Sequence, residues 1–210
     1  MNMSGRKAQA ARNDTIIVEA ARKVFVAEPS APIAAVAEAA GVGISALYRR
    51  YPSKEDLLRK VCADGLATYT SIVQAAVDDT EGDPWEVFET FMRRVVETDT
   101  HSITVALAGT FAPTPDLWGA AENSGRLNTE LMERAKRAGA IRPDVSDADL
   151  GVIFEQLAAV HEGDERRTND LRQRYLTLIL DGMRLPPATT PLPSEAPTLD
   201  ERAARWTVRT

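Results

Sequence analysis

Side chains that could bind a polyanion are concentrated in one short segment of the first third of the chain. Hydroxyl, phenol, guanidinium and ammonium groups follow one another there, on Ser45, Tyr48, Arg49, Arg50 and Lys54. Groups of these types reach the phosphates and base edges of DNA. The segment from about residue 44 to residue 50 also has helical spacing, and it is too polar between its apolar residues for core packing alone. The spacing therefore predicts a short helix that contacts nucleic acid.

Lys54 gives a separate indication at the start of the following helix. Pro52 and Ser53 open that helix, with Ser53 as its N-cap. A cation in the first turn opposes the helix dipole at a cost of a few tenths of a kcal/mol. Two interpretations stay open here: a solvated lysine tolerated on the surface, or a lysine that meets an anion docked at the helix start.

These side chains can act only if other elements hold the short helix outward. A helix-turn-helix needs a small residue where its two helices nearly touch, a glycine at the turn and an apolar residue that anchors the second helix. Ala37, Gly41 and Leu47 meet these three needs in the right order. Residues 12–58 are therefore predicted to form a three-helix DNA-binding domain whose first helix begins at Asn13.

Helical periodicity continues through most of the remaining chain. Apolar residues recur at helical spacing as far as residue 184, without strand-like alternation of useful length. We therefore expect an all-α fold, in which residues 59–185 form a larger domain for ligand binding and dimerisation. Residues 1–11 are expected to be a flexible basic arm. Residues 186–210 are rich in Pro, Thr and Ser and are expected to be a disordered tail.

Residues 36–58 resemble the signature of the tetracycline-repressor (TetR) family of transcriptional regulators. They read VAEAAGVGISALYRRYPSKEDLL, where the family pattern is roughly iA..AGVs.gtlY.hFpsKe.Ll. Two later stretches, residues 138–145 and 175–185, are similar to segments of many members. The resemblance implies a regulator of the repressor type, which binds an inverted-repeat operator in double-stranded DNA as a dimer and is released by a small-molecule ligand.

The family pattern also implies which residues touch DNA. Phosphates would be contacted by Tyr48 and Lys54. The major groove would be faced by the first residues of the recognition helix, with Arg50 within reach. Those first residues are Ile44, Ser45 and Ala46.

Two departures from the family pattern are visible in this chain. Ser30-Ala31-Pro32 stands where many members have threonines, so a usual phosphate contact is missing or moved to Ser30. Tyr51 stands where the family usually has phenylalanine. Arg50 stands where the family usually has histidine or arginine, and the changes at positions 50 and 51 are mild.

Charge and composition agree with a basic DNA-binding module attached to an acidic domain. The chain has a net charge of −6, divided into +4 over residues 1–60 and −10 over residues 61–210. The single cysteine, Cys62, excludes an intramolecular disulfide framework and suits a reducing cytoplasm. No apolar run approaches the roughly 18–20 residues that cross a bilayer, so no membrane partner is expected.

The larger domain offers a dimer surface and a candidate ligand pocket. Its last two long helices are apolar on two sides, so we expect one side to face the core and the other to face the same helices of a second subunit. The middle helices are expected to enclose the unknown effector. The large side chains that could line such a pocket are Trp85, Phe88, Phe91, Met92, Phe111, Trp118 and Phe154.

No pattern of catalytic or cofactor-binding residues occurs in the sequence. Gly41-Val42-Gly43 follows a predicted helix instead of a strand, so it is no dinucleotide loop. His101 and His161 lie far apart without metal-ligand spacing, so no metal and no cofactor are expected. We therefore expect no enzyme. One alternative stays open, an all-α ligand-binding or adaptor protein that has lost specific DNA binding.

Overall fold

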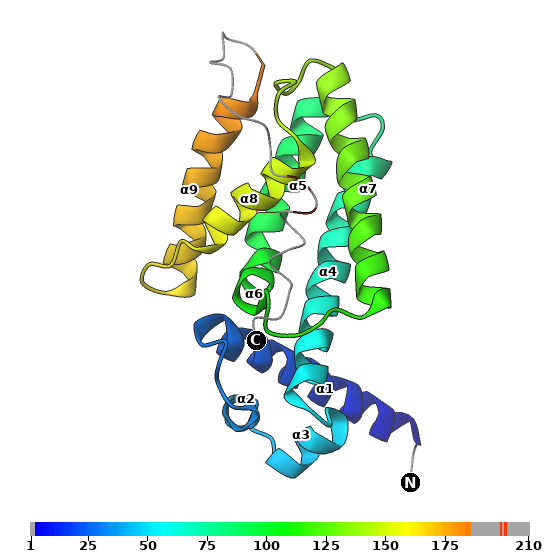
Figure 1. The fold of residues 1–210 in the computed structure, drawn as a ribbon, viewed down its shortest axis with the longest axis vertical. Coiled ribbons are helices and arrows are strands. Elements are labelled where there is room, and N and C mark those ends of the chain that lie inside the picture. The colour runs from blue at the N-terminus through cyan, green and yellow to red at the C-terminus, as the bar shows by residue number, and fades with distance from the viewer. Residues whose placement is uncertain (1–2, 186–197, 199, 201–210) are drawn as a thin grey trace.

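The computed structural model describes residues 3–185, 198 and 200, with side chains from residue 12 onward. Over these residues the chain forms nine helices (Figure 1): α1 (Met3–Ala27), α2 (Ile33–Ala39), α3 (Ile44–Arg50), α4 (Lys54–Asp78), α5 (Pro84–Glu97), α6 (Thr100–Leu107), α7 (Pro115–Arg137), α8 (Asp147–Ala158) and α9 (Glu165–Met183). Extended pairing in this part of the chain is limited to one bridge between Ile141 and Arg184. The expected all-α fold is confirmed.

The molecule is elongated, with a small head at one end and a larger body above it (Figure 1). The head consists of α1–α3, and α4 rises from it into the body, where it runs beside α7. Head and body have separate clusters of buried apolar side chains. No helix among the described residues has the length and apolar character that spanning a membrane requires.

Helix α1 begins earlier than the sequence indicated. It starts at Met3 instead of Asn13, so it includes most of the segment that we expected to be a flexible arm. Ala, Arg, Lys and Gln dominate residues 6–12, and all four are strong helix formers that let the helix continue toward the N-terminus. The predicted disordered tail, residues 186–210, lies outside the described residues except for 198 and 200.

The start of α4 is fixed by the cap that the sequence indicated. Ser53 accepts a hydrogen bond from the backbone N–H of Asp56 at 3.0 Å and donates its hydroxyl to the Asp56 carboxylate at 2.7 Å. This pairing satisfies an N–H that has no partner within the helix. It also sets the direction in which α4 leaves the head.

Helix α6 packs on the head although it follows α5 of the body. Its buried residues Ile103 and Leu107 belong to the head cluster, together with Phe111 just beyond the helix. Phe111 therefore lies in the head core, away from the other aromatic side chains that were predicted to line a pocket. Because α6 also contacts α4 and α8, it connects head and body.

Candidate nucleic-acid interface

The helix-turn-helix scaffold is built by the three residues that the sequence singled out. Ala37 is buried and Leu47 is fully buried, both in the head core. Gly41 has a φ of +64°, a left-handed conformation that glycine adopts without steric cost. The backbone N–H of Val42 then bonds to the Ala37 carbonyl at 3.0 Å, which closes the turn between α2 and α3. As a result, one face of α3 is anchored and the opposite face is free.

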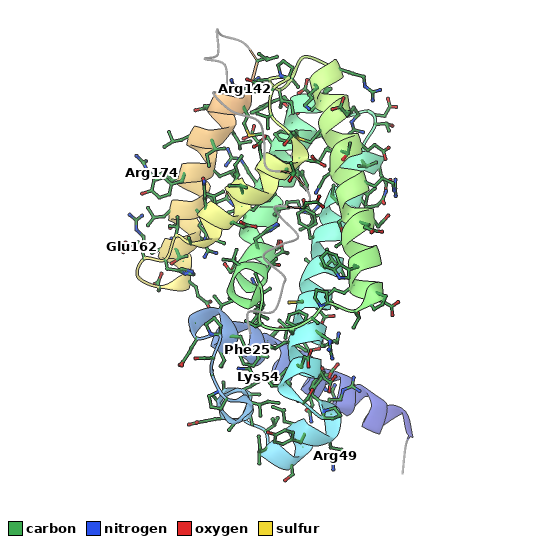
Figure 2. The ribbon with its side chains drawn as sticks, viewed as in Figure 1. Phe25, Arg49, Lys54, Arg142, Glu162 and Arg174 are labelled. Atoms are coloured by element: carbon green, nitrogen blue, oxygen red, sulfur yellow. The ribbon has the colours of Figure 1, made fainter. Side chains whose placement is uncertain are left out.

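The free face of α3 carries most of the expected DNA-contacting side chains. Ile44 is 40% exposed and Tyr48 is 47% exposed, and Ser45 and Arg49 are exposed beside them. Figure 2 shows Arg49 at the lower extremity of the head, pointing away from the protein. Arg49 has no hydrogen bond or ion pair with any described residue. Ala46 is half-buried and leaves room for close approach of a partner.

Arg50, at the end of α3, is paired with α1 at the surface of the head, with its side chain 60% exposed. Its Nε donates to Oδ1 of Asp14 at 2.7 Å and its Nη2 to Oδ2 at 3.1 Å, while the Tyr51 hydroxyl donates to Oδ1 at 2.6 Å. The hydrogen bond from Arg50 holds the pKa of Asp14 below its ordinary value. Burial and the neighbouring Asp14 raise the pKa of Tyr51. Asp14 thus fastens the recognition helix to α1, and a phenylalanine in place of Tyr51 would lack one of these bonds.

Lys54, in contrast, points inward. Its ammonium donates to the carbonyls of Pro29 and Ala31 at 3.1 and 2.7 Å, and it lies 5.0 Å from the centre of the Phe25 ring (Figure 2). Desolvation lowers the pKa of this ammonium. The cation in the first turn of α4 is therefore stabilised by carbonyls of the loop before α2. This arrangement differs from both interpretations left open by the sequence, a solvated lysine and a lysine that meets a docked anion. Two of its three N–H groups are occupied in this way.

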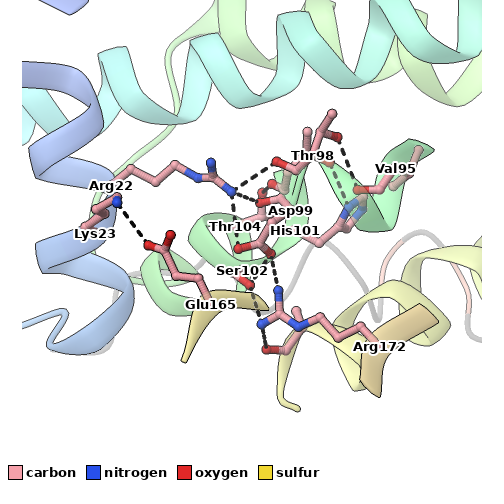
Figure 3. Close-up of polar contacts among 12 residues, drawn as sticks. Arg22, Lys23, Val95, Thr98, Asp99, His101, Ser102, Thr104, Glu165 and Arg172 are labelled. Atoms are coloured by element: carbon pink, nitrogen blue, oxygen red, sulfur yellow. Dashed lines mark hydrogen bonds and ion pairs between the residues drawn. The ribbon is translucent and has the colours of Figure 1, made fainter. Parts of the chain in front are cut away.

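A polar cluster joins the head to the body (Figure 3). Nη2 of Arg22, on α1, lies 3.1 Å from the Thr98 carbonyl and 3.2 Å from Oδ2 of Asp99. The same aspartate pairs through Oδ1 with Nη1 of Arg172, on α9, at 2.8 Å. Arg172 is buried and bonds further to the carbonyls of Ala158 and Val160 at 2.8 and 3.1 Å.

Asp99 occupies an unusual backbone position within this cluster. Its φ of 49° is the only positive value for a non-glycine residue in the part of the chain that the structure describes. This conformation turns the chain sharply between α5 and α6, and Asp tolerates it better than most residues. The turn places one carboxylate between a head arginine and a body arginine.

Sequence reasoning missed this cluster because its members lie far apart in the chain. One signal was available, since Arg172 shares its spacing with the buried residues Leu176, Leu180 and Met183 of α9. A charged residue in an apolar stripe indicates a buried ion pair. Nothing in the sequence identifies Asp99 or Arg22 as its neighbours.

The expected pocket residues of the body are packed against one another. Trp85, Phe88, Phe91, Met92 and Phe154 are buried in the body cluster, and their rings make edge and tilted contacts. Of these, Phe154 borders a hollow of about 10 Å³, which is the size of one water molecule. Trp118 is 40% exposed on α7. In this conformation these side chains therefore form core and surface, and a larger hollow lies elsewhere.

That larger hollow is a groove of about 700 Å³ between α4 and α7, open to one side. It is lined by Arg59, Lys60, Ala63, Ala67, Thr70, Ser71, Gln74, Thr114, Asp116, Leu117, Ala120 and Asn123. None of the seven predicted pocket residues is among them. Over the described residues there is also no group of three or more His, Cys, Asp or Glu side chains that could hold a metal ion.

Two family models match the chain. The model for bacterial regulatory proteins of the tetR family matches residues 17–61, and the model for the C-terminal domain of SbtR-like transcriptional regulators matches residues 83–185. Together they cover most of the sequence, and the chain belongs to the TetR family of transcriptional regulators. None of the curated proteins compared with the chain matches it significantly.

Solved structures agree with this assignment. A TetR regulatory protein from Mycobacterium vanbaalenii is 27% identical, with a TM-score of 0.57, over 85% of this chain and 99% of that one. A TetR regulator from Streptomyces coelicolor is 29% identical, with a TM-score of 0.57, over 83% and 99%. LfrR from Mycobacterium smegmatis, solved in complex with proflavine, shares the fold at 22% identity and a TM-score of 0.60, over 79% and 95%.

Proposed function

We propose that the protein is a repressor that binds an inverted-repeat operator as a homodimer through α3 and leaves it when a small molecule binds. The observation that carries this proposal is the exposed face of α3. The helix is anchored on its opposite face by buried Leu47 and at its end by the Asp14–Arg50 pair. Its two large apolar side chains, Ile44 and Tyr48, are exposed and have no core to pack against. Because a regulator of this kind acts on the chromosome, the proposal includes a cytoplasmic location.

The side chains of α3 divide by chemistry into those that grip DNA and those that read it. Tyr48 and Arg49 are suited to contact phosphates, because they are exposed and project from the head. Ile44 offers an apolar surface to a thymine methyl group, and Ser45 offers a hydroxyl to a base edge. The small side chain of Ala46 permits their approach.

Arg50 and Lys54 play a mainly positioning role in this proposal. Both are bound within the head, although Nη1 of Arg50 and one N–H of Lys54 are not used in those bonds. Arg50 orients the recognition helix against α1, and Lys54 orients the loop before α2 against α4. A phosphate contact from either would be additional to this role.

Dimerisation is proposed to use α8 and α9, as their apolar character suggested. On α9, Tyr175 is 42% and Leu178 is 63% exposed, and Leu171 lies on the same helical face. Exposed large apolar side chains in one row favour burial against a second copy. Two copies are also needed to read enough base pairs for selectivity, since half-sites are spaced by the dimer geometry.

Release by a small molecule requires that the ligand bind two states of the dimer unequally. A roughly 100-fold difference in affinity corresponds to about 2.7 kcal/mol. The Asp99 cluster supports such coupling because it connects α1 of the head to α9 of the proposed dimer surface (Figure 3). A structural neighbour, LfrR, was solved in complex with proflavine, and this favours a small molecule as the effector here.

Selection from a genomic DNA library by the purified protein tests the proposal. We expect enrichment of a short inverted repeat, and we expect Ile44→Ala or Ser45→Ala to change the preferred bases at symmetric positions. The matched control is Thr80→Ala, a small polar change at an exposed residue just beyond the end of α4. Enrichment of no common motif would contradict the proposal and favour a ligand-binding or adaptor protein.

A further inference from the structure

Helix α1 is attached at two points, one to the recognition helix and one to the body. Asp14 accepts two hydrogen bonds from Arg50 at the end of α3, and Arg22 binds the turn between α5 and α6. About 12 Å of helix separates Asp14 from Arg22, at a rise of about 1.5 Å per residue. Because α1 is one continuous helix between these points, a change of its direction at Arg22 also moves α3.

Arg22 binds the body at the end of α5. Its Nη2 donates to the carbonyl of Thr98 at 3.1 Å and also to the carbonyl of Asp99, and both oxygens follow the last turn of α5. The carboxylate of Asp99 lies 3.2 Å from the same nitrogen. A cation is favoured at the C-terminus of a helix by the partial negative charge of the last carbonyls. Arg22 thus caps a helix of the body although it belongs to the head.

Arg172 binds the same turn from the opposite side (Figure 3). Its Nη1 pairs with Oδ1 of Asp99 at 2.8 Å, and its Nη2 donates to the hydroxyl of Ser102, on α6, at 3.2 Å. Only 5% of the Arg172 side chain is exposed, and its remaining bonds reach carbonyls at the end of α8. Since Arg172 lies on α9, the turn is fixed relative to the helix that is proposed to form the dimer.

The contacts of these two arginines are directional, whereas the apolar contacts between head and body are not. Ile103 and Leu107 of α6 are buried in the head core, but the hydrophobic effect that favours their burial has no directional preference. A guanidinium carries its N–H groups in a fixed plane, so its bonds to oxygen atoms constrain an angle as well as a distance. The angle between head and body therefore depends mainly on Asp99 and its two arginines.

A small change of this angle is large on the scale of DNA. A rotation of about 15° at Arg22 would move the Asp14 end of α1 by about 3 Å, close to the rise of about 3.4 Å per base pair. In a dimer the spacing of the half-sites follows from the distance between the two recognition helices. A rotation of this size in both heads would therefore alter the spacing that fits.

We infer that Arg22, Asp99 and Arg172 determine the spacing between half-sites that the dimer selects. The inference rests on the proposed function, in which α3 reads each half-site and α9 joins the two subunits. It makes these three side chains positioning residues for DNA recognition. Specificity for spacing then comes from the junction of head and body, and specificity for sequence comes from α3.

Titration against operators of different spacing tests the inference. The selected inverted repeat is compared with versions in which one base pair is added to its centre or removed from it. Arg22→Gln removes the head side of the contact, at a side chain that is 38% exposed, so the variant is expected to fold.

Lys23→Gln is the matched control. It removes the same charge from the next residue of α1, and it also breaks an ion pair between head and body, with Glu165 of α9 at 2.9 Å. The two side chains of that pair are 70% and 84% exposed, so the pair constrains the head little.

We expect the wild type and Lys23→Gln to prefer the selected spacing at least tenfold over either altered spacing. In Arg22→Gln this preference should fall at least threefold, while the preferred bases of each half-site stay the same. A general loss of stability would lower affinity for all spacings alike, so it would leave the ratio of affinities unaltered. A ratio for Arg22→Gln equal to that for Lys23→Gln would overturn the inference, and so would a wild type that is indifferent to spacing.

The distance between head and body, measured without DNA, separates failure of this inference from failure of the proposed function. Spin labels on Ala39→Cys, at the end of α2, and Ala138→Cys, after α7, report this distance by pulsed electron paramagnetic resonance, and both alanines are exposed. The native thiol takes no label, because Cys62 is buried and burial raises its pKa to about 12. Dilution with unlabelled protein restricts the signal to distances within one chain.

Adding Arg22→Gln to the labelled protein should broaden the distribution of distances, and adding Lys23→Gln should not. A distribution that stays as narrow as that of the otherwise unchanged protein would contradict the inference even if the wild type binds its operator. A broadened distribution in a protein that selects no inverted repeat would support the positioning role of Arg22 and contradict the proposed function.

Discussion

The carboxylate of Asp14 accepts two hydrogen bonds from Arg50, at 2.7 and 3.1 Å, so the last residue of α3 is fixed to α1. Arginine at this position is therefore held by the protein before DNA arrives. The orientation of the recognition helix depends on a pair whose members come from different helices. Conditions that break the Asp14–Arg50 pair should therefore lower the stability of the head.

Head stability should depend on pH at both extremes through Asp14 and Tyr51. The pKa of Asp14 is lowered on folding, so its contribution is present above the unfolded value and is lost as the pH falls below about 4. The pKa of Tyr51 is raised, so its contribution is present below the unfolded value and is lost as the pH rises above about 10. Urea unfolding at each pH measures both losses.

Two variants separate these contributions. The stability advantage of the wild type over Asp14→Asn should vanish on the acid side, and its advantage over Tyr51→Phe should vanish on the alkaline side. An advantage that is constant across the whole pH range would contradict the role of the pair.

Arg49 and Lys54 should differ in the salt dependence of DNA binding. Arg49→Ala removes a free cation, so we expect lower affinity for all sequences and a salt slope reduced by about one. Lys54→Met removes an internal cation, so we expect lower stability and lower affinity with an unchanged slope. Titrations at several salt concentrations, with Arg137→Ala as an exposed matched control on α7, decide the matter. A salt slope reduced by about one for Lys54→Met would instead support the direct phosphate contact that the family pattern implies for Lys54.

Asp99 should matter for its charge more than for its backbone conformation. Asp99→Asn keeps a residue type that tolerates positive φ and removes the charge that faces buried Arg172. The Asp99–Arg172 pair is partly exposed on the aspartate side. We therefore expect the free energy of unfolding to fall by about 2 kcal/mol, between the values typical of surface and of buried ion pairs. A double-mutant cycle with Arg172→Met measures the coupling by denaturant unfolding.

Arg22→Gln, which acts only on the head side of the same carboxylate, serves as the comparison. Its effect should be smaller, because the Arg22 side chain is 38% exposed whereas that of Arg172 is 5% exposed. Equal losses of stability for Arg22→Gln and Arg172→Met would argue against Arg172 as the stronger partner of Asp99.

Leu178→Arg should convert the protein to a monomer. Leu178 is 63% exposed, so the folded monomer can accept arginine there, whereas a buried dimer surface cannot. Sedimentation at micromolar concentration checks the change, and Trp118→Arg, another exposed apolar residue, is the control that should stay dimeric. A wild-type protein that sediments as a monomer would contradict the proposed dimer itself.

Periodicity and short-range signals made the fold predictable. Caps such as Ser53, the turn at Gly41 and the stripe around Leu47 are local patterns, so they could be read from adjacent residues. The start of α1 was missed because Asn13 has the residue type of an N-cap, whereas the helix continues through Asn13 and Gly5 to Met3.

The candidate site was only partly predictable, because side-chain partners are set by tertiary packing. Arg50 and Lys54 have the right types for DNA contact, yet the fold gives each a partner on another segment. Large side chains were predicted from their size to line a pocket. Five of them pack against one another in the body core, on residues 85, 88, 91, 92 and 154, and their contact with a ligand stays a prediction. A groove made by alanines leaves no comparable pattern in sequence.

The separation of head and body along the long axis makes the molecule an electric dipole (Figure 1). Residues 1–60 carry a net charge of +4 and residues 61–210 a net charge of −10. In the field of a duplex such a dipole experiences a torque that turns the head toward the phosphates before contact. We therefore expect the acidic body to repel side-on encounters, so that the protein approaches DNA with α3 foremost. This orientation operates over a Debye length, about 8 Å at physiological salt.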